Sequence, residues 1–196
     1  MSAPTVEFYF DYGSPTAYLA YTQLPAICAR NGAQLEYKPI LLGAVFKATG
    51  NQTPVAIKAK GQWMMADMER FARHYGVPYK MNPHFIINSL PLMRGAVWAQ
   101  RENCFDSYNR AIQQAMWVDG IDLGNSDEVA RVLSAAGLDA GAMAVAIQSD
   151  AIKNGLVQAT NEAVGRGVFG APTMFVNGAM HFGQDRLDWV ERALQS

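Results

Sequence analysis

The stretch that decides the fold spans Val6–Ala20 and reads VEFYFDYGSPTAYLA. Its first part, Val6–Phe10, is rich in β-branched and aromatic residues, which is typical of a largely buried strand. Asp11-Tyr12-Gly13 breaks this strand, and Ser14-Pro15 then begins a helix, because serine is a preferred N-cap and proline is tolerated at the first helical position. The helix is expected to end near Asn31-Gly32. The sequence thus predicts a strand, a tight turn and a helix in direct succession.

A second strand, predicted over Gln34–Pro39, completes a strand-helix-strand unit at the N-terminus, because apolar and polar residues alternate there ahead of the proline. Near the other end of the chain, Asn177-Gly178 stands between two short apolar runs, which is the strongest short-range signal for a β-hairpin. The hairpin strands and a closing helix are predicted at residues 173–176, 179–182 and about 184–194.

Between these two ends, from Leu42 to about Arg166, apolar residues recur at intervals of three and four, which is the period of one helix face. One stripe of methionine and aromatic residues either packs in the core, the commoner use, or lines a pocket for an aromatic ligand. Its members are Met64, Met68, Phe71 and Tyr75. We therefore predict an α/β fold in which a small mixed sheet (βαβ … ββα) carries a large all-helical insertion. The sheet domain would comprise residues 1–41 and 167–196, and the insertion residues 42–166.

Composition and charge argue against several classes of protein. The chain has 196 residues, with 16 Lys and Arg against 17 Asp and Glu, and a formal net charge of -1. Without a run of basic residues it lacks the surface that holds a nucleic acid or an acidic membrane. No stretch is apolar for long enough to span a bilayer, and Glu7 and Asp11 do not suit a signal peptide, so a cytoplasmic location is expected. The spacing of Cys28, Cys104 and the three histidines predicts neither a disulfide framework nor a metal site.

Ser14 is the first candidate for chemistry, because it lies where a strand gives way to a helix. A hydroxyl there sits among unsatisfied backbone donors and at the positive end of the helix dipole, which together stabilise an anion such as a thiolate. The simpler interpretation makes Ser14 an N-cap with no further role. A serine hydrolase is not supported, because the chain has no G-x-S-x-G motif. We expect the insertion to pack over Ser14 and to wall an apolar cavity, since its apolar faces exceed what one small sheet can cover.

Pro172, in Gly170-Ala171-Pro172-Thr173, is the second candidate. Proline cannot donate a hydrogen bond to a strand ladder, so Pro172 must stand at the very start of its strand. A trans peptide bond is the default expectation, since only about 5–6% of X-Pro bonds are cis. Neither Ser14 nor Pro172 indicates a function alone.

Taken together, DYGSPTAYLA at 11–20 and VFGAPTMFVNG at 168–178 resemble the corresponding motifs of the 2-hydroxychromene-2-carboxylate isomerase family. That family is similar to kappa-class glutathione transferases, and both have a thioredoxin fold whose halves are separated by a helical domain. The resemblance covers nearly the whole chain. It extends to the segments Gly50-Asn51, Lys60-Gly61 and Gly183-Gln184-Asp185-Arg186. In thioredoxin-fold oxidoreductases, the positions that match Ser14 and Ala17 carry the two cysteines. Dithiol exchange needs both sulfurs, so oxidoreductase activity is excluded at this site.

The resemblance implies that glutathione is the cofactor and that it brings the missing thiolate. Ser14 is then expected to donate a hydrogen bond to the glutathione sulfur and to lower the pKa of its thiol. The Ala171 backbone, held by a cis bond before Pro172, is expected to pair with the cysteinyl unit.

The same resemblance implies the remaining contacts with glutathione. Gln184 and Asp185, at the start of the last helix, are expected to hold the γ-glutamyl end. Asn51 and Lys60 are expected to contact the rest of the tripeptide. For two of these residues a plain structural role is equally open: helix capping for Asp185 and a solvated surface charge for Lys60.

The family's reaction opens the ring of an aryl 2-hydroxychromene-2-carboxylate and yields a trans-benzylidenepyruvate. Addition of a thiolate turns a carbon-carbon double bond into a single bond, rotation follows, and elimination returns the glutathione. The carboxylate of this small aromatic substrate needs a cation and amide donors, for which Lys47, Asn88 and Arg94 are the candidates. The chain departs from the isomerase pattern at His84–Leu90, which lacks a basic cluster. The resemblance also implies a homodimer that works in the degradation of naphthalene-like aromatics.

Two alternatives remain open from the sequence. A kappa-type glutathione transferase or peroxidase would share the thiolate site but consume glutathione. A carrier without catalytic activity, for glutathione or a hydrophobic ligand, would keep Asn51, Asp185 and Pro172 but would have no need of Ser14.

Overall fold

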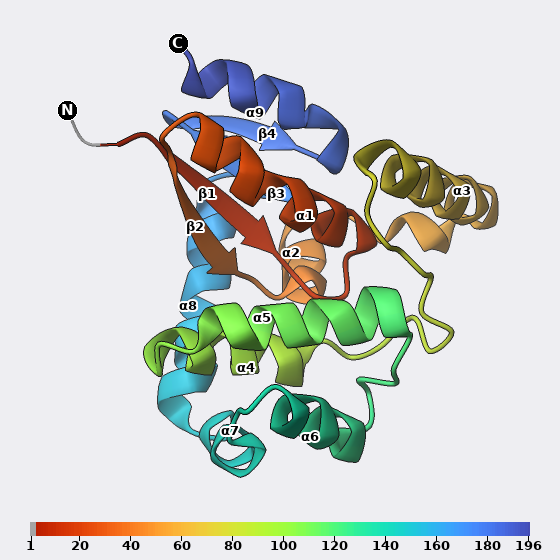
Figure 1. Cartoon of the computed structure of the whole chain (residues 1–196), viewed down its shortest axis with the longest axis vertical. Coiled ribbons are helices and arrows are strands. Elements are labelled where there is room, and N and C mark those ends of the chain that lie inside the picture. Colours follow the sequence, from red (N-terminus) through yellow and green to blue (C-terminus); the bar gives the residue numbers. More distant parts are fainter. Residues whose placement is uncertain (1–2) are drawn as a thin grey trace.

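The structure, a computed structural model, describes residues 3–196 of the chain. Within these residues, four strands form one sheet in the order β2-β1-β3-β4. β1 (Thr5–Phe10) pairs in parallel with β2 (Gln34–Pro39) and antiparallel with β3 (Thr173–Val176), which in turn pairs antiparallel with β4 (Ala179–Phe182). The two ends of the sequence therefore build a single mixed sheet, as Figure 1 shows.

Helices cover both faces of the sheet. α1 (Pro15–Arg30) and α9 (Leu187–Leu194) lie together on one face (Figure 1). α2 (Leu42–Thr49) and α8 (Asp150–Gly165) pack on the other face. A strand covered on both sides is apolar nearly throughout, which explains why β1 lacks a strict alternation of apolar and polar residues.

The side chains of β1 divide between the two faces. Phe8 and Phe10 are fully buried in the large core that includes α1 and α9. Tyr9 points to the other side, where it packs in a small cluster with Phe175, Val45 of α2 and Ala163 of α8. The sheet thus holds α2 and α8 by a separate apolar contact, which fixes α2 beside the end of β1.

The insertion between β2 and β3 is helical over most of its length. α3 extends away from the sheet, whereas α4 and α5 pack against each other with α6 and α7 beyond them (Figure 1). The further helices are α3 (Lys58–Tyr75), α4 (Leu90–Arg101), α5 (Phe105–Gln114), α6 (Ser126–Ala135) and α7 (Ala140–Ala146). A 3-10 turn (Pro54–Ala56) precedes α3, and a π-helical turn (Ala115–Asp119) follows α5. None of the helices in the described part of the chain is long and apolar enough to cross a membrane.

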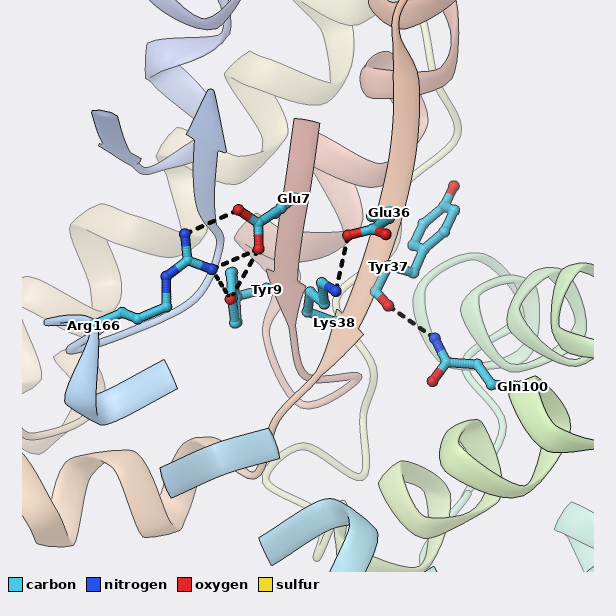
Figure 2. Close-up of polar contacts among 7 residues, drawn as sticks. All are labelled: Glu7, Tyr9, Glu36, Tyr37, Lys38, Gln100 and Arg166. Atoms are coloured by element: carbon cyan, nitrogen blue, oxygen red, sulfur yellow. Dashed lines mark hydrogen bonds and ion pairs between the residues drawn. The ribbon is translucent and has the colours of Figure 1, made fainter. Parts of the chain in front are cut away.

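Polar contacts tie the sheet to the insertion (Figure 2). Arg166, directly after α8, pairs with Glu7 of β1, with Nη2 2.9 Å from Oε1, and lies over the Phe175 ring at 4.1 Å from its centroid. The hydrogen bond from Arg166 holds the pKa of Glu7 below its ordinary value. At the edge strand, Gln100 Nε2 donates to the Tyr37 carbonyl at 2.8 Å and so occupies one of the acceptors that an open edge exposes (Figure 2).

The predicted fold class and order of elements are confirmed, with one difference near the C-terminus. The last helix was expected from Gln184, but Gln184–Arg186 form a 3-10 turn and the α-helix begins at Leu187. Gly183, at φ 102°, directs the chain into this tighter turn, a common start for a helix. The division into a sheet domain and an insertion stays a prediction, because one continuous core joins the sheet to α4 and α5.

Candidate functional site

A cleft of about 790 Å³ lies where the insertion meets the N-terminus of α1. Its floor is the first turn of α1, and its walls come from α2, α3 and the segments on either side of the β3–β4 hairpin. Aromatic and sulfur-containing side chains line much of it: Phe46, Trp63, Met64, Met68, Phe85, Phe169 and Phe182. The expectation that the insertion covers Ser14 and walls a largely apolar cavity is confirmed.

Ser14 lies in the floor of this cleft and is only 4% exposed. It is the N-cap of α1, and its Oγ accepts a hydrogen bond from the Ala17 N–H at 3.2 Å. The same oxygen lies 3.1 Å from the Ala171 carbonyl, to which it donates, and 2.9 Å from Thr16 Oγ1. Ser14 therefore caps α1, and the same Oγ atom also faces the cleft.

The peptide bond between Ala171 and Pro172 is cis, which the resemblance implied and which the default expectation for proline did not. The Pro172 carbonyl accepts a hydrogen bond from the Gly183 N–H at 3.0 Å. This bond joins the segment before β3 to the start of the Gln184–Arg186 turn. The Ala171 carbonyl faces Ser14, as expected. Among residues 3–196, the Ala171 N–H has no hydrogen-bond partner, and it is available to a ligand in the cleft.

The four other residues that the resemblance assigned to glutathione all line the cleft. Gln184 is only 6% exposed, yet its side-chain amide has no partner within the described residues. Asn51 Nδ2 donates to the Phe169 carbonyl at 2.8 Å, so part of its hydrogen-bonding capacity holds the cleft wall. Asp185 pairs with Arg186, with Oδ2 2.8 Å from Nη1. Lys60, in the first turn of α3, is exposed at the cleft wall.

The three residues predicted for the substrate carboxylate do not come together at this site. Lys47 is exposed on α2, and Asn88 is exposed before α4, where its Oδ1 accepts from the Leu90 N–H at 3.1 Å. Arg94 lies half-buried in α4, and its buried Nε has no partner within residues 3–196. None of the three belongs to the residues that line the cleft. The helix period explains Lys47, because Phe46 and Thr49 take the cleft-facing positions of α2.

Sequence reasoning missed several side chains of the cleft. Arg186 lies in a segment that carries the resemblance, and Thr16 lies in the first turn of α1 directly after Ser14-Pro15, so both could have been found from their neighbours. Phe169 and Phe182 pack against each other at one wall, with ring centroids 4.5 Å apart and the rings tilted by 47°. No sequence signal links these two rings, because only the hairpin brings them together. Of the methionine and aromatic stripe, Met64 and Met68 reach the cleft, whereas Tyr75 donates to the Gln184 carbonyl at 2.6 Å.

A buried carboxyl group anchors the loop that carries Ser14. Asp11 is 1% exposed, and its two oxygens accept hydrogen bonds from the Gly13 and Leu42 N–H groups, both at 2.8 Å. Burial raises the pKa of Asp11, although the hydrogen bonds to Leu42 and Gly13 oppose that rise. The side chain thereby joins the turn after β1 to the start of α2, which sets the floor of the cleft against one of its walls.

The donors and acceptors of the cleft fit glutathione. Ser14 Oγ at a helix N-terminus suits a sulfur anion, and the Ala171 N–H and carbonyl suit the amide groups of a peptide. Gln184, Lys60 and Asp185 offer partners for two carboxylates and an ammonium. Neither cysteine lines the cleft, and burial raises the pKa of the Cys28 thiol to about 11. In the described part of the chain no group of three His, Cys, Asp or Glu side chains could hold a metal ion.

Comparison with known proteins places this geometry in a family. A model described as the DSBA-like thioredoxin domain matches residues 5–195. The 2-hydroxychromene-2-carboxylate isomerase of Sphingobium xenophagum is 35% identical over 192 residues, 97% of each chain. The chain belongs to the DSBA-like thioredoxin family and, within it, to the 2-hydroxychromene-2-carboxylate isomerase family. A solved structure of an enzyme of that name superposes with a TM-score of 0.88 at 31% identity, covering 97% of this chain and 94% of the other.

More distant members of the family include kappa glutathione transferases. The human glutathione S-transferase kappa 1 is 25% identical over 206 residues, 97% of this chain and 90% of its own. A probable DsbA oxidoreductase from Streptomyces coelicolor shares the fold, with a TM-score of 0.74 at 16% identity over 98% of this chain and 88% of its own. In the chain described here, serine and alanine occupy positions 14 and 17, so neither position carries a thiol.

Proposed function

We propose that this protein is a glutathione-dependent isomerase that converts 2-hydroxychromene-2-carboxylates into trans-benzylidenepyruvates in the degradation of naphthalene-like aromatics. The observation that carries the proposal is the Ser14 hydroxyl, which caps α1 at the floor of an aromatic cleft that holds no cysteine. The isomerases that match nearly the whole chain support the same activity.

Glutathione, when bound, supplies the thiolate that adds reversibly to a conjugated double bond. Ser14 stabilises negative charge on the sulfur by donating a hydrogen bond, and the start of α1 adds the positive end of the helix dipole. The Ala171 N–H and carbonyl hold the cysteinyl unit in place. Gln184 and Asp185 bind the γ-glutamyl end. They do so from a 3-10 turn, whereas the sequence predicted the first turn of an α-helix.

The walls of the cleft suit the aromatic part of the substrate. Phe46, Trp63 and Met64 offer flat or polarisable surface and exclude water from the reacting bond. For the substrate carboxylate we favour Arg186 over the three residues predicted from the sequence, because Arg186 lines the cleft and those three residues do not. Arg186 is half-exposed and paired only with its neighbour Asp185, so it has donors to spare.

The test follows substrate and glutathione in one reaction. Purified protein, 2-hydroxychromene-2-carboxylate and glutathione are combined, the ring-opened product is followed by its ultraviolet absorbance, and free thiol is counted before and after. We expect product formation that requires glutathione while the amount of glutathione stays unchanged. Equal rates with and without glutathione would refute the cofactor, and the absence of product would refute the isomerase.

A kappa-type transferase is the second candidate, because kappa transferases match 97% of the chain and the thiolate site would serve both reactions. A transferase consumes glutathione, so an aryl halide offered as substrate separates the two. Loss of free thiol in step with conjugate formation would favour the transferase.

A further inference from the structure

Three oxygen atoms meet at the floor of the cleft. Ser14 Oγ lies 2.9 Å from Thr16 Oγ1 and 3.1 Å from the Ala171 carbonyl oxygen, and Thr16 Oγ1 lies 3.2 Å from that same oxygen. The Ala17 N–H also donates to Ser14 Oγ. Thr16 and Ser14 thus form a hydrogen bond with each other and contact the same carbonyl oxygen. The proposed function gives Thr16 no role.

The Ser14 and Thr16 hydroxyl groups can donate one hydrogen bond each. A serine hydroxyl donates one hydrogen bond and accepts up to two. When Ser14 donates to the Ala171 carbonyl, it has no proton left for a ligand. Ser14 can turn its proton toward an anion in the cleft only if this buried carbonyl finds another donor, because an unpaired buried acceptor is costly.

Thr16 can support hydrogen-bond donation by Ser14 to the ligand in either of two arrangements. It can donate to the Ala171 carbonyl in place of Ser14, which leaves the Ser14 proton free. If an amide N–H of the ligand takes the Ala171 carbonyl instead, Thr16 can donate to Ser14 Oγ, which then accepts two hydrogen bonds and becomes a stronger donor. In the first arrangement the Thr16 hydroxyl frees the Ser14 proton for a sulfur anion, and in the second it strengthens Ser14 as a donor to that anion. Every polar atom of the trio stays paired in both.

We propose that Thr16 is a positioning residue that frees the Ser14 proton for the glutathione sulfur, or strengthens the hydrogen bond that Ser14 donates to it, and thereby lowers the pKa of the bound thiol. The inference rests on the proposed function, because it needs glutathione in the cleft. Within residues 3–196, Thr16 supplies the one side-chain hydroxyl that contacts both Ser14 Oγ and the Ala171 oxygen.

The chain offers a matched set of variants. Thr16→Val keeps the β-branched shape and removes the hydroxyl, whereas Thr16→Ser keeps the hydroxyl and removes a methyl group. Thr16→Ala serves as a second variant without a hydroxyl. Thr22→Val is the control, because Thr22 lies in the same helix, bonds the Leu19 carbonyl and does not line the cleft.

The experiment measures the bound thiol itself. Each protein is saturated with glutathione and titrated with pH while the ultraviolet absorbance of the thiolate is recorded. Calorimetry with S-methylglutathione, which has no ionisable thiol, gives the affinity for the rest of the tripeptide, and circular dichroism checks the fold.

Removing the Thr16 hydroxyl is expected to raise the pKa of the bound thiol by about 0.5 to 1 unit, the effect of one ordinary hydrogen bond. Thr16→Val and Thr16→Ala should both show this rise, while Thr16→Ser and Thr22→Val keep the wild-type pKa. The affinity for S-methylglutathione should change by less than about twofold in all of them, because the contacts along the tripeptide remain.

Two results would overturn the inference, and they differ in what else they affect. If folded Thr16→Val and Thr16→Ala bind glutathione with the wild-type thiol pKa, Thr16 does not act on Ser14 and the proposed function stands. If the wild-type protein binds neither glutathione nor S-methylglutathione, the proposed function fails and this inference fails with it.

Discussion

Ser14 combines two tasks in one oxygen atom. Its Oγ accepts the Ala17 N–H, which caps α1, and its single proton is available for donation at the floor of the cleft. Serine and glycine stabilise a helix N-terminus to nearly the same degree, but glycine has no hydroxyl. Substitution at this position can therefore separate the cap from the chemistry.

Ser14→Ala is expected to lower turnover about ten- to two-hundred-fold, with a much smaller change in affinity for glutathione. A hydrogen bond to a charged group contributes about 1.5–3 kcal/mol, and this one matters most while charge resides on sulfur. Steady-state kinetics at saturating glutathione gives the turnover, and calorimetry gives the affinity.

Ser14→Gly is the control for helix capping. If the hydroxyl serves only the helix, Ser14→Ala costs about 1 kcal/mol of unfolding free energy, Ser14→Gly costs a few tenths, and both keep their activity once folded. Full activity in both variants would contradict the role of Ser14 in stabilising the thiolate.

At the scale of elements, the Asp11 carboxylate joins the turn before α1 to the start of α2. Each of its two oxygens accepts one backbone N–H, from Gly13 or from Leu42. Asp11→Asn keeps one acceptor and turns an amide N–H₂ toward a backbone donor. We expect a loss of about 1–3 kcal/mol of unfolding free energy, measured by urea denaturation, with Asp188→Asn on the exposed side of α9 as the control. Equal stability of wild type and Asp11→Asn would contradict the anchoring role.

The end of α1 and the surface of α9 are joined by an ion pair that should be lost in acid. Arg30 Nη2 lies 2.6 Å from Glu191 Oε2, and hydrogen bonds from Arg30 and Asn31 lower the pKa of Glu191 to about 2. A lowered pKa means that the pair stabilises the fold fully above the ordinary pKa of 4.5 and loses this contribution as pH falls toward 2.

Glu191→Gln removes the charge and keeps the shape. The difference in unfolding free energy between wild type and Glu191→Gln should be about 0.5–1 kcal/mol near pH 6, because both partners are open to solvent, and should vanish near pH 2. Urea denaturation across this pH range measures it. A difference that stays constant with pH would show that the pair contributes nothing through its charge.

The elements that the sequence predicts best are those with local signals. Asn177-Gly178 locates the hairpin to the residue, and Ser14-Pro15 locates the start of α1. The predicted start of the last helix was wrong by about three residues, because the pattern of apolar residues does not distinguish a 3-10 turn from the first turn of an α-helix. Lys47 and Arg94 lie outside the cleft for a different reason: the sequence does not tell which face of α2 or α4 turns toward Ser14.

At the scale of the whole molecule, the cleft lies between parts that are far apart in the sequence. Ser14, Lys60 and Gln184 contribute to it from α1, from α3 and from the turn before α9. A ligand that bridges them should therefore stabilise the fold as a unit, because separating any wall also breaks the binding site.

Glutathione at ten times its dissociation constant is expected to raise the melting temperature by about 3–6 °C, from the binding linkage and the usual unfolding entropy of a chain of this size. Differential scanning calorimetry measures the shift. Lys60→Ala should reduce it, whereas Lys47→Ala, outside the cleft, should not. A shift that depends on Lys47 and not on Lys60 would contradict the placement of glutathione in this cleft.

No cysteine lines the cleft, and this determines how the protein responds to reactive chemicals. An alkylating agent such as iodoacetamide finds no cysteine there to modify, since Cys28 is buried elsewhere and Cys104 lies away from the site. Peroxide likewise has no thiol to oxidise at the reacting centre. Under the proposed function the rate would instead follow how much of the surrounding glutathione pool remains reduced.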